Sequence, residues 1–317
     1  MINKRILIIY HRVDFDGIFS GDIVKLSAID TFDHEPDLIG YNYGDDIPNI
    51  SILKSYDKVI LVDISFPPEY MKQLLEIEMN TPNTIIWIDH HVTAINNSIE
   101  HGYDSLPGLR RNGTAACELT WEYFYQDRQT PAIIQRLGAY DVWDKSRFDW
   151  ENETLPLQSA LRLTYGNGEY YIWPVFGELI SKTNDDLEHL YQLGRELNKA
   201  DAIRFKSDVE RFGFPITVAG KYKGIGIMGT SFTSLVFASV LEEYDIYLVM
   251  NRRRKTVDDE TQYIFQLSMY SEPGRIDFNL GQYLQSRFGN DAGGHATAAG
   301  AQVPREVFDE LLDEGTI

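Results

Sequence analysis

The sequence of 317 residues contains one cysteine, Cys117, and lacks long apolar runs. A single cysteine excludes disulfide bonds within the chain and metal sites built from several thiolates. No apolar run approaches the ~20 residues that span a bilayer, and the amino terminus lacks the apolar core of a signal peptide. We therefore expect a cytoplasmic protein that does not contact a membrane.

Basic residues are also scarce. The chain has 29 Lys and Arg against 48 Asp and Glu, which gives a formal net charge of −19. Such a surface repels a polyanion, so tight binding of long DNA or RNA through many phosphate contacts is not expected. A short anionic substrate held at bound metal ions is compatible with this charge, because the local field at a site can oppose the global one.

Apolar residues, by contrast, are abundant enough for two cores, and the length favours two domains. The first part alternates short runs rich in Ile and Val with segments of helical spacing. The expected strands are at 6–10, 38–43 (weak), 59–62 and 85–88, and the expected helices at 21–28, 67–79, 115–125 and 131–141, followed by an aromatic-rich helical cap at 148–176. This alternation predicts an α/β fold with a parallel, doubly wound sheet.

The pattern changes after a long amphipathic segment at 185–212. Short apolar runs and few helices follow it, which predicts a smaller α+β domain. The expected strands are at 216–219, 224–228, 246–250 and 263–269, and the expected helices at 232–241 and 280–287. We predict a catalytic domain with a helical cap at 1–182, a connector helix at 183–212 and a second domain at 213–317.

Acids and histidines directly follow three of the expected strands, and one more acid ends an expected helix. They are His11, Asp14, Asp16, Asp63, Asp89, His90, His91 and Asp141. Because ligands bind at the carboxyl edge of an open parallel sheet, we expect these side chains to converge there. Any one of the acids could instead cap a helix, and Asp144 could serve in place of Asp141.

The mixture of imidazoles and carboxylates indicates a particular metal chemistry. It suits a divalent first-row metal such as Mn²⁺, whereas Ca²⁺ prefers oxygen ligands alone. Several carboxylates at close range cannot all stay ionised without a cation, so the set indicates more than one ion. Two ions about 3.5–4 Å apart are the usual arrangement for phosphoester hydrolysis.

Five motifs in sequence order resemble the DHH phosphoesterase family, in the branch with a DHH-associated carboxyl-terminal domain that includes nanoRNases and phosphoadenosine phosphatases. The motifs are His11-x-x-Asp14-x-Asp16-Gly17, Asp63 after a strand, Asp89-His90-His91, Asp141 after a helix, and Gly293-Gly294-His295-x-x-Ala298-Ala299-Gly300. The resemblance covers nearly the whole chain. It departs from the family at Tyr270, where an Arg commonly grips phosphate, and the first motif is one residue tighter than usual.

The resemblance implies two Mn²⁺ ions, which Mg²⁺ or Co²⁺ could replace. One ion would be held by His11, Asp14 and Asp63, and the other by Asp16, Asp63, His90 and Asp141. Asp89 would orient a ligand histidine, and His91 would face the substrate phosphate as a catalytic residue. The active site would lie in a cleft between the domains, with 213–317 as the DHH-associated, substrate-binding domain.

The glycine signature allows two interpretations. Gly293 and Gly294 let backbone N–H groups approach an anion, and the Ala-rich stretch after them could start a helix whose amino end attracts phosphate. His295 would reach the same phosphate, and Arg275 or the basic run at 252–254 could replace the missing guanidinium. Alternatively, the signature is a tight turn between two elements.

The motifs predict a two-metal phosphoesterase that uses metal-activated water. The resemblance implies that its substrates are short oligonucleotides, as for an oligoribonuclease, or dinucleotides or small nucleotide phosphates. Dense aromatic residues at 143–173 could stack nucleobases or only pack. A short-chain exopolyphosphatase and a catalytically silent nucleotide-binding module are the alternatives. The expected partner is a short nucleotide or oligonucleotide, and whether the chain forms a homodimer stays open.

Overall fold

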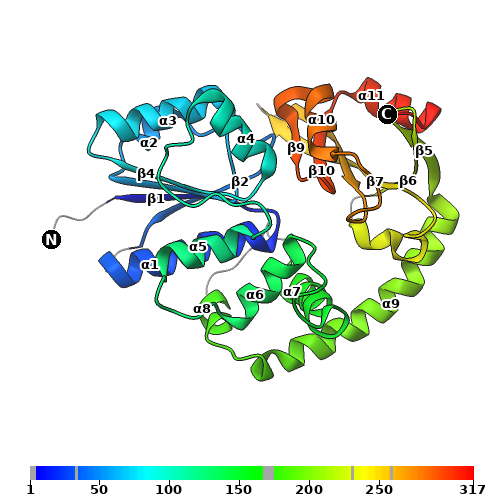
Figure 1. Cartoon of the computed structure of the whole chain (residues 1–317), viewed down its shortest axis with the longest axis horizontal. Helices are drawn as coiled ribbons and strands as arrows, with labels where there is room; N and C mark the ends of the chain where they lie inside the picture. The colour runs from blue at the N-terminus through cyan, green and yellow to red at the C-terminus, as the bar shows by residue number, and fades with distance from the viewer. Residues whose placement is uncertain (1–4, 33–34, 167–174, 230–231, 258–259) are drawn as a thin grey trace. The chain divides into compact units, whose positions relative to one another are not determined.

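A computed structural model describes residues 5–32, 35–166, 175–229, 232–257 and 260–317 (Figure 1). The chain splits into two compact units, Met1–Asn198 (unit 1) and Lys199–Ile317 (unit 2). The boundary falls inside the long helix α9 (Glu188–Phe212), which occupies most of the segment expected to be a connector. The domain boundaries drawn from the sequence stay a prediction. Within the described ranges, the longest helices are too short or too polar to cross a membrane.

Unit 1 is built on a parallel four-stranded sheet with the strand order β2-β1-β3-β4. The strands are β1 (Ile6–His11), β2 (Asp37–Tyr41), β3 (Lys58–Val62) and β4 (Thr84–Ile88). The strands expected from the apolar runs are therefore present, and the weak one forms β2, at one edge of the sheet. The other three are almost wholly buried, as apolar strands covered on both faces should be.

Helices cover both faces of this sheet (Figure 1). On one face, Leu61 and Trp87 pack with the helical residues of α2 (Ile50–Leu53), α3 (Pro68–Asn80) and α4 (Val92–His101). On the other face, Ile60 and Ile86 pack against α1 (Phe15–Phe32) and α5 (Ala116–Phe124). Alternate residues of each strand thus serve opposite cores, which confirms the parallel, doubly wound sheet.

Helix α1 begins inside the first motif and is longer than the helix expected at 21–28. Asp14 caps it, because its Oδ1 accepts a hydrogen bond from the Gly17 N–H at 2.9 Å. A Cβ on Gly17 would come within 2.2 Å of the His11 carbonyl oxygen. Glycine at this position therefore lets the first turn of α1 press against the end of β1.

A second layer of helices packs on α1 and α5 and forms one shared core with them. It consists of α6 (Ala132–Asp141), a π-helical turn (Trp150–Thr154), α7 (Leu155–Tyr165), α8 (Val175–Ile180), a 3₁₀ turn (Asp185–Leu187) and the first half of α9. The described part of the aromatic-rich segment is therefore helical, as expected. Tyr170, Tyr171 and Trp173 lie outside the described residues.

Unit 2 contains a six-stranded mixed sheet with the order β5-β6-β7-β8-β10-β9, in which only β6 and β7 pair in parallel. Its elements are β5 (Phe214–Val218), β6 (Tyr222–Met228), β7 (Ile246–Val257), β8 (Glu260–Tyr270), α10 (Leu280–Phe288), β9 (Ala292–Gly294), β10 (Ala298–Val303) and α11 (Arg305–Glu314), with 3₁₀ turns at Ser234–Val240 and Gly289–Asp291. The predicted α+β class of this part is confirmed.

Two helices expected in unit 2 are wrong. The Ala-rich stretch after the glycine pair forms strand β10, which pairs with β8 and β9. Its small residues Ala299 and Ala301 lie in the core with Leu280 and Leu284, so α10 can approach the sheet closely. Within 232–241 the chain makes a 3₁₀ turn at Ser234–Val240, in the connection between the parallel neighbours β6 and β7, and this turn buries Val236 and Phe237 against residues of those strands.

Candidate metal centre

The carboxyl ends of β1, β3 and β4 lie side by side, because neighbouring parallel strands end at the same edge of the sheet. His11 is the last residue of β1, and Asp63 directly follows β3. Asp89, His90 and His91 directly follow β4. The expected convergence of these residues is therefore a consequence of the sheet topology.

The first cluster joins His11, Asp14 and Asp63, whose ligand atoms lie within 4.8 Å of one another. The Nδ1 atom of His11 lies 2.9 Å from Asp14 Oδ2 and 3.4 Å from Asp63 Oδ2. Burial opposes a charged His11, but the two carboxylates outweigh it and raise the pKa of the imidazole well above its usual value. The tight spacing of the first motif thus still brings Asp14 to the imidazole.

The second cluster surrounds His90, which is buried. Its Nε2 atom lies 3.3 Å from Asp63 Oδ1, 3.3 Å from Asp141 Oδ2 and 3.5 Å from Asp16 Oδ2. Although burial opposes the charged imidazole, Asp141 and the other carboxylates raise the pKa of His90 well above its usual value. Asp63 therefore contacts both clusters, with Oδ2 toward the first and Oδ1 toward the second.

Asp63 is held in an unusual backbone conformation, with a φ of 59°. Aspartate tolerates this left-handed region better than most residues, yet the conformation still costs about 1–3 kcal/mol. Its N–H donates to the Ile88 carbonyl at 3.0 Å, which ties the ends of β3 and β4 together. The buried Oδ1 of Asp63 accepts no hydrogen bond of good geometry from the described residues.

The Asp16 carboxylate contacts both the backbone of α5 and the His90 ring. Its carboxylate accepts hydrogen bonds from the Ala116 N–H at 2.8 Å and the Cys117 N–H at 2.7 Å, so it also satisfies the amino end of α5. Burial, and then the charge of Asp63, raise the pKa of Asp16 to about 7. Burial and the charge of Asp16 likewise raise the pKa of Asp141 well above its usual value.

These observations test whether the residues fit divalent cations. The carboxylates crowd one another, the buried Oδ1 of Asp63 accepts no hydrogen bond of good geometry from the described residues, and the donor set mixes imidazole nitrogen with carboxylate oxygen. A cation would relieve the crowding and complete the coordination of the Asp63 oxygen. The residues of the two clusters therefore fit divalent cations.

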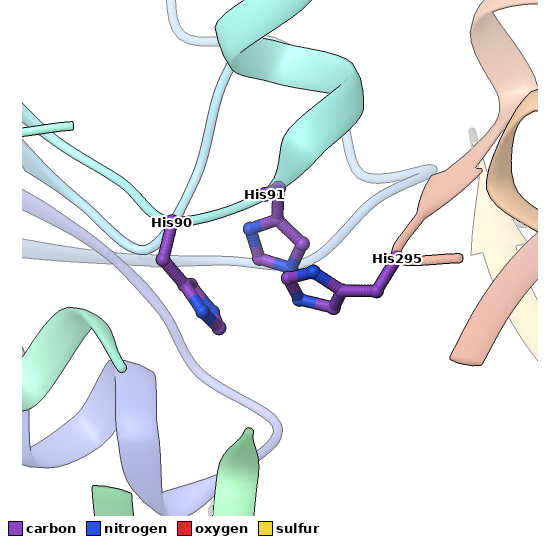
Figure 2. A group of neighbouring side chains, drawn as sticks. All are labelled: His90, His91 and His295. Carbon is purple, nitrogen blue, oxygen red and sulfur yellow. The ribbon is translucent and has the colours of Figure 1, made fainter. Parts of the chain in front are cut away.

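Asp89 organises the segment that follows β4 and is fully buried. Its Oδ1 accepts hydrogen bonds from the backbone N–H groups of His90 at 2.7 Å and His91 at 3.1 Å. The same oxygen lies 2.8 Å from His91 Nδ1. Figure 2 shows the His90 and His91 rings on the turn that leads into α4. Asp89 thus orients His91, and a contact of this kind selects the tautomer of the ring.

The segment 107–111 runs beside β4 as an irregular extra strand. The Trp87 N–H donates to the Pro107 carbonyl at 2.8 Å, and the Asp89 N–H donates to the Leu109 carbonyl at 3.1 Å. A Cβ on Gly108 would lie 2.0 Å from the Trp87 carbonyl oxygen, so this approach requires glycine. Arg110 donates to the Trp87 carbonyl at 2.9 Å, and Arg111 pairs with Glu122. Both arginines are therefore engaged within unit 1.

Asp141 and Asp144 are separated by the end of α6. Asp141 Oδ2 lies 3.3 Å from His90 Nε2, whereas Asp144 Oδ1 accepts hydrogen bonds from the Ser146 N–H and hydroxyl. The structure therefore brings Asp141, and not Asp144, to His90. An ion pair between Arg147 and Glu118 braces the segment after Asp144, and sequence reasoning missed it because no local pattern relates two charges in distant segments.

The glycine signature in unit 2 forms a tight hairpin turn between β9 and β10. Gly294 has a φ of 131°, and the His295 N–H donates to the Ala298 carbonyl at 2.7 Å. The backbone carbonyl of His295 accepts a hydrogen bond from the Gly281 N–H of α10 at 3.0 Å. Figure 2 labels the side chain of His295. The glycine signature therefore forms the tight turn that was one of its two interpretations. A role in binding phosphate stays a prediction.

Arg275 also has contacts within unit 2. Its Nη2 donates to the Glu242 carbonyl at 2.9 Å, and its Nε lies 3.6 Å from Asp245. The Arg253 side chain lies outside the described part of the structure, whereas Arg252 is exposed and lies over the Tyr263 ring at 4.8 Å. Which arginine meets a substrate phosphate therefore stays a prediction.

No family model matches the sequence. An uncharacterized protein of Acanthamoeba polyphaga mimivirus is 28% identical over 152 residues, which are 43% of this chain and 33% of the viral protein. The match therefore spans about a third of the length of this curated relative. Among solved structures, a DHH domain from a member of the s1p family of ribosomal proteins matches with a TM-score of 0.57 and 14% identity, over 98% of this chain and 85% of that one. The chain therefore has the DHH-domain fold, as its strand-end motifs led us to expect.

Proposed function

We propose that this chain is a two-metal phosphoesterase of the DHH type that hydrolyses short oligonucleotides, dinucleotides or small nucleotide phosphates. One observation carries the proposal: the two oxygens of Asp63 face two separate clusters of imidazole and carboxylate groups at one sheet edge. A purely structural network would not need to leave Asp63 Oδ1 buried with no hydrogen bond of good geometry from the described residues. The DHH-domain fold supports the same activity.

The proposed ligands follow the two clusters. His11, Asp14 and Asp63 would hold one ion, and Asp16, Asp63, His90 and Asp141 the other. Two bound divalent ions, with Mn²⁺ the best match to this donor set, would supply an activated water and stabilise charge on the oxygens around phosphorus.

Two residues of the chain would act in the reaction: Asp89 would orient the His91 ring, and His91 would transfer one proton. Asp89 fixes the His91 ring through Nδ1 and leaves Nε2 as the atom that reaches the substrate. Hydrolysis forms a bond from the water oxygen to phosphorus and breaks the ester bond, and the leaving oxygen needs a proton. We assign the delivery of that proton to His91.

The substrate class rests on charge and on unit 2. A net charge of −19 disfavours long nucleic acids, so a short substrate fits better. Gly293, Gly294 and His295, together with Arg275, are the proposed substrate-binding residues of unit 2. A short-chain exopolyphosphatase and a silent nucleotide-binding module are the competing proposals.

The test measures product release from diadenylate, a short RNA, 3′-phosphoadenosine 5′-phosphate, cyclic di-AMP and tripolyphosphate, each with Mn²⁺ and with chelator. We expect metal-dependent cleavage of a nucleotide substrate by the wild type and none by Asp63→Asn. Cleavage of tripolyphosphate alone would select the polyphosphatase. Bound metal without turnover of any substrate would select the binding module.

A further inference from the structure

Trp143 occupies a backbone position that normally belongs to glycine. Helix α6 ends with two hydrogen bonds, from the Asp144 N–H to the Ala139 carbonyl at 2.9 Å and from the Trp143 N–H to the Tyr140 carbonyl at 3.1 Å. This pair of bonds is a Schellman motif, whose residue beyond the cap is left-handed. Trp143 takes that position with a φ of 55°. A bulky residue is unfavourable there, so the indole ring must contribute something that glycine would not.

The Trp143 ring stands at the rim of an aromatic cluster. Tyr140 and Trp150 stack nearly parallel, at 7° and 5.9 Å between centroids. The Trp143 ring is steeply inclined to both, at 67° to Tyr140 and 74° to Trp150. Within the described ranges, no aromatic ring lies parallel to Trp143, and its side chain is only half-buried. A planar group from outside the chain could therefore stack on it.

Charge and position both favour a nucleotide as that group. The Lys145 ammonium lies over one face of the Trp143 ring, 5.2 Å from its centroid, which puts a cation at the indole in an acidic chain and leaves the other face for a base. Trp150, the buried member of this cluster, begins a π-helical turn. Such turns are frequent at functional sites. Asp141, only two residues before Trp143, lies 3.3 Å from His90 in the candidate metal centre.

We propose that Trp143 is a specificity-determining residue that stacks on the nucleobase of the substrate. The inference rests on the proposed function insofar as it makes the occupant a nucleotide whose phosphate reaches the metal centre. A ring attached to the end of α6 would read the base, while the Asp141 carboxylate on the same helix serves the phosphate site. The alternative is that the Trp143 ring only packs on Trp150 within the aromatic cluster and binds no ligand.

The experiment compares the affinities of adenosine 5′-monophosphate and ribose 5-phosphate, measured by calorimetry in the presence of Mn²⁺. The two ligands share sugar and phosphate and differ in the base. We expect the wild type to prefer the nucleotide by about tenfold or more, the size of one base stack. Trp143→Gly should abolish this preference and leave the affinity for ribose 5-phosphate unchanged.

Two further variants keep the test decisive. Trp143→Asn also lacks the ring, and Asn tolerates the left-handed backbone, so it replaces Trp143→Gly if that variant is unfolded by circular dichroism. Trp121→Phe changes a buried indole in α5 that stacks on Tyr125 and should lower stability without changing the base preference. A base preference that survives in a folded ring-less variant overturns the inference, as does a wild type with no base preference.

The outcome is separable from that of the proposed function. Hydrolysis of diadenylate by the wild type is measured in parallel. A wild type that prefers the nucleotide through Trp143 but hydrolyses nothing would refute the phosphoesterase and retain the base-stacking residue. Hydrolysis with equal kcat and KM in the wild type and Trp143→Gly would retain the phosphoesterase and refute the base-stacking residue.

Discussion

The two units place polar residues at the ends of strands in different ways. In unit 1 the strands are parallel, so the residues after β1, β3 and β4 meet at one edge although they are far apart in sequence. In unit 2 the glycine signature lies in a turn between the antiparallel strands β9 and β10, and backbone groups of the turn itself, of α10 and of the end of β8 satisfy its hydrogen bonds. The parallel sheet thus gathers side chains from distant segments, whereas the hairpin turn is held mainly by backbone hydrogen bonds.

This difference shows where a chemical site can be inferred from topology. At the edge in unit 1, several carboxylates crowd two imidazoles, and Asp63 Oδ1 accepts no hydrogen bond of good geometry from the described residues. In the hairpin of unit 2, the N–H and the carbonyl of His295 both already have backbone partners. The first arrangement favours cations, whereas the backbone of the second is already held by hydrogen bonds.

The largest effect is expected from Asp63→Asn. Both clusters share Asp63, so its loss should remove bound metal and lower kcat/KM by about 10³-fold or more. The matched control is Asp57→Asn, at the opposite end of the same strand, where Asp57 accepts a hydrogen bond from the Arg5 N–H. Metal content by mass spectrometry and turnover are the measurements. If Asp57→Asn lost as much metal as Asp63→Asn, the two ends of β3 would not differ as we argue.

A smaller loss should follow from Asp141→Asn, because Asp141 contacts one cluster only. We expect activity to fall by at least the ~10–100-fold that loss of a supporting partner costs a metal site. Asp144→Asn, three residues on, should keep activity, since that side chain bonds to Ser146. Titration of Mn²⁺ into both variants compares their affinities, and equal affinities would remove Asp141 from the site.

In unit 2, Gly294→Ala tests the hairpin. A Cβ there would lie 2.6 Å from the Ala298 carbonyl oxygen, and the φ of 131° already disfavours alanine. We expect a loss of about 1–3 kcal/mol in the free energy of unfolding. Gly289→Ala is the control, because it also has a positive φ but no atom within 4 Å of its Cβ position. Denaturant unfolding should rank Gly294→Ala as the less stable variant, and the reverse order would contradict the hairpin packing.

The smallest effect is the pH dependence of the metal-free protein. The pKa of Asp16 is raised from 3.8 to about 7, so its contribution to stability is complete below pH 3.8 and is lost as the pH rises through 7. The raised pKa values of His11 and His90 act in the same direction, since their stabilisation is lost above the usual value of 6.5. Denaturant unfolding with chelator should therefore show lower stability at pH 8 than at pH 5.5.

Asp16→Asn separates the contribution of Asp16 from those of the histidines. The variant cannot ionise at this position, so the decrease between pH 5.5 and pH 8 should become shallower. Mn²⁺ should raise the stability of the wild type more at pH 8 than at pH 5.5, because deprotonated carboxylates bind the cation. Stability that rises with pH in chelator would show that the carboxylates do not crowd one another as described.

The sequence alone determined the class of the fold and the candidate ligands. Period and composition located β1, β3 and β4, and the polar residues after them stood out because apolar runs ended abruptly. It did not show that α1 starts at Phe15, because this depends on the close approach of Gly17 to His11. It also did not show that the Ala-rich stretch after Gly294 is a strand, since alanine is compatible with both states and α10 decides between them.

Only the tertiary structure decided which of the candidate residues lie next to one another. The order β1-β3-β4 puts Asp63 between His11 and His90, and strand order is not written in local spacing. The turn that ends α6, where Trp143 takes a left-handed conformation, separates Asp144 from Asp141, which lies next to His90. Local patterns record which residues are polar or apolar, whereas the distances that make a metal site arise from packing between segments that the sequence keeps apart.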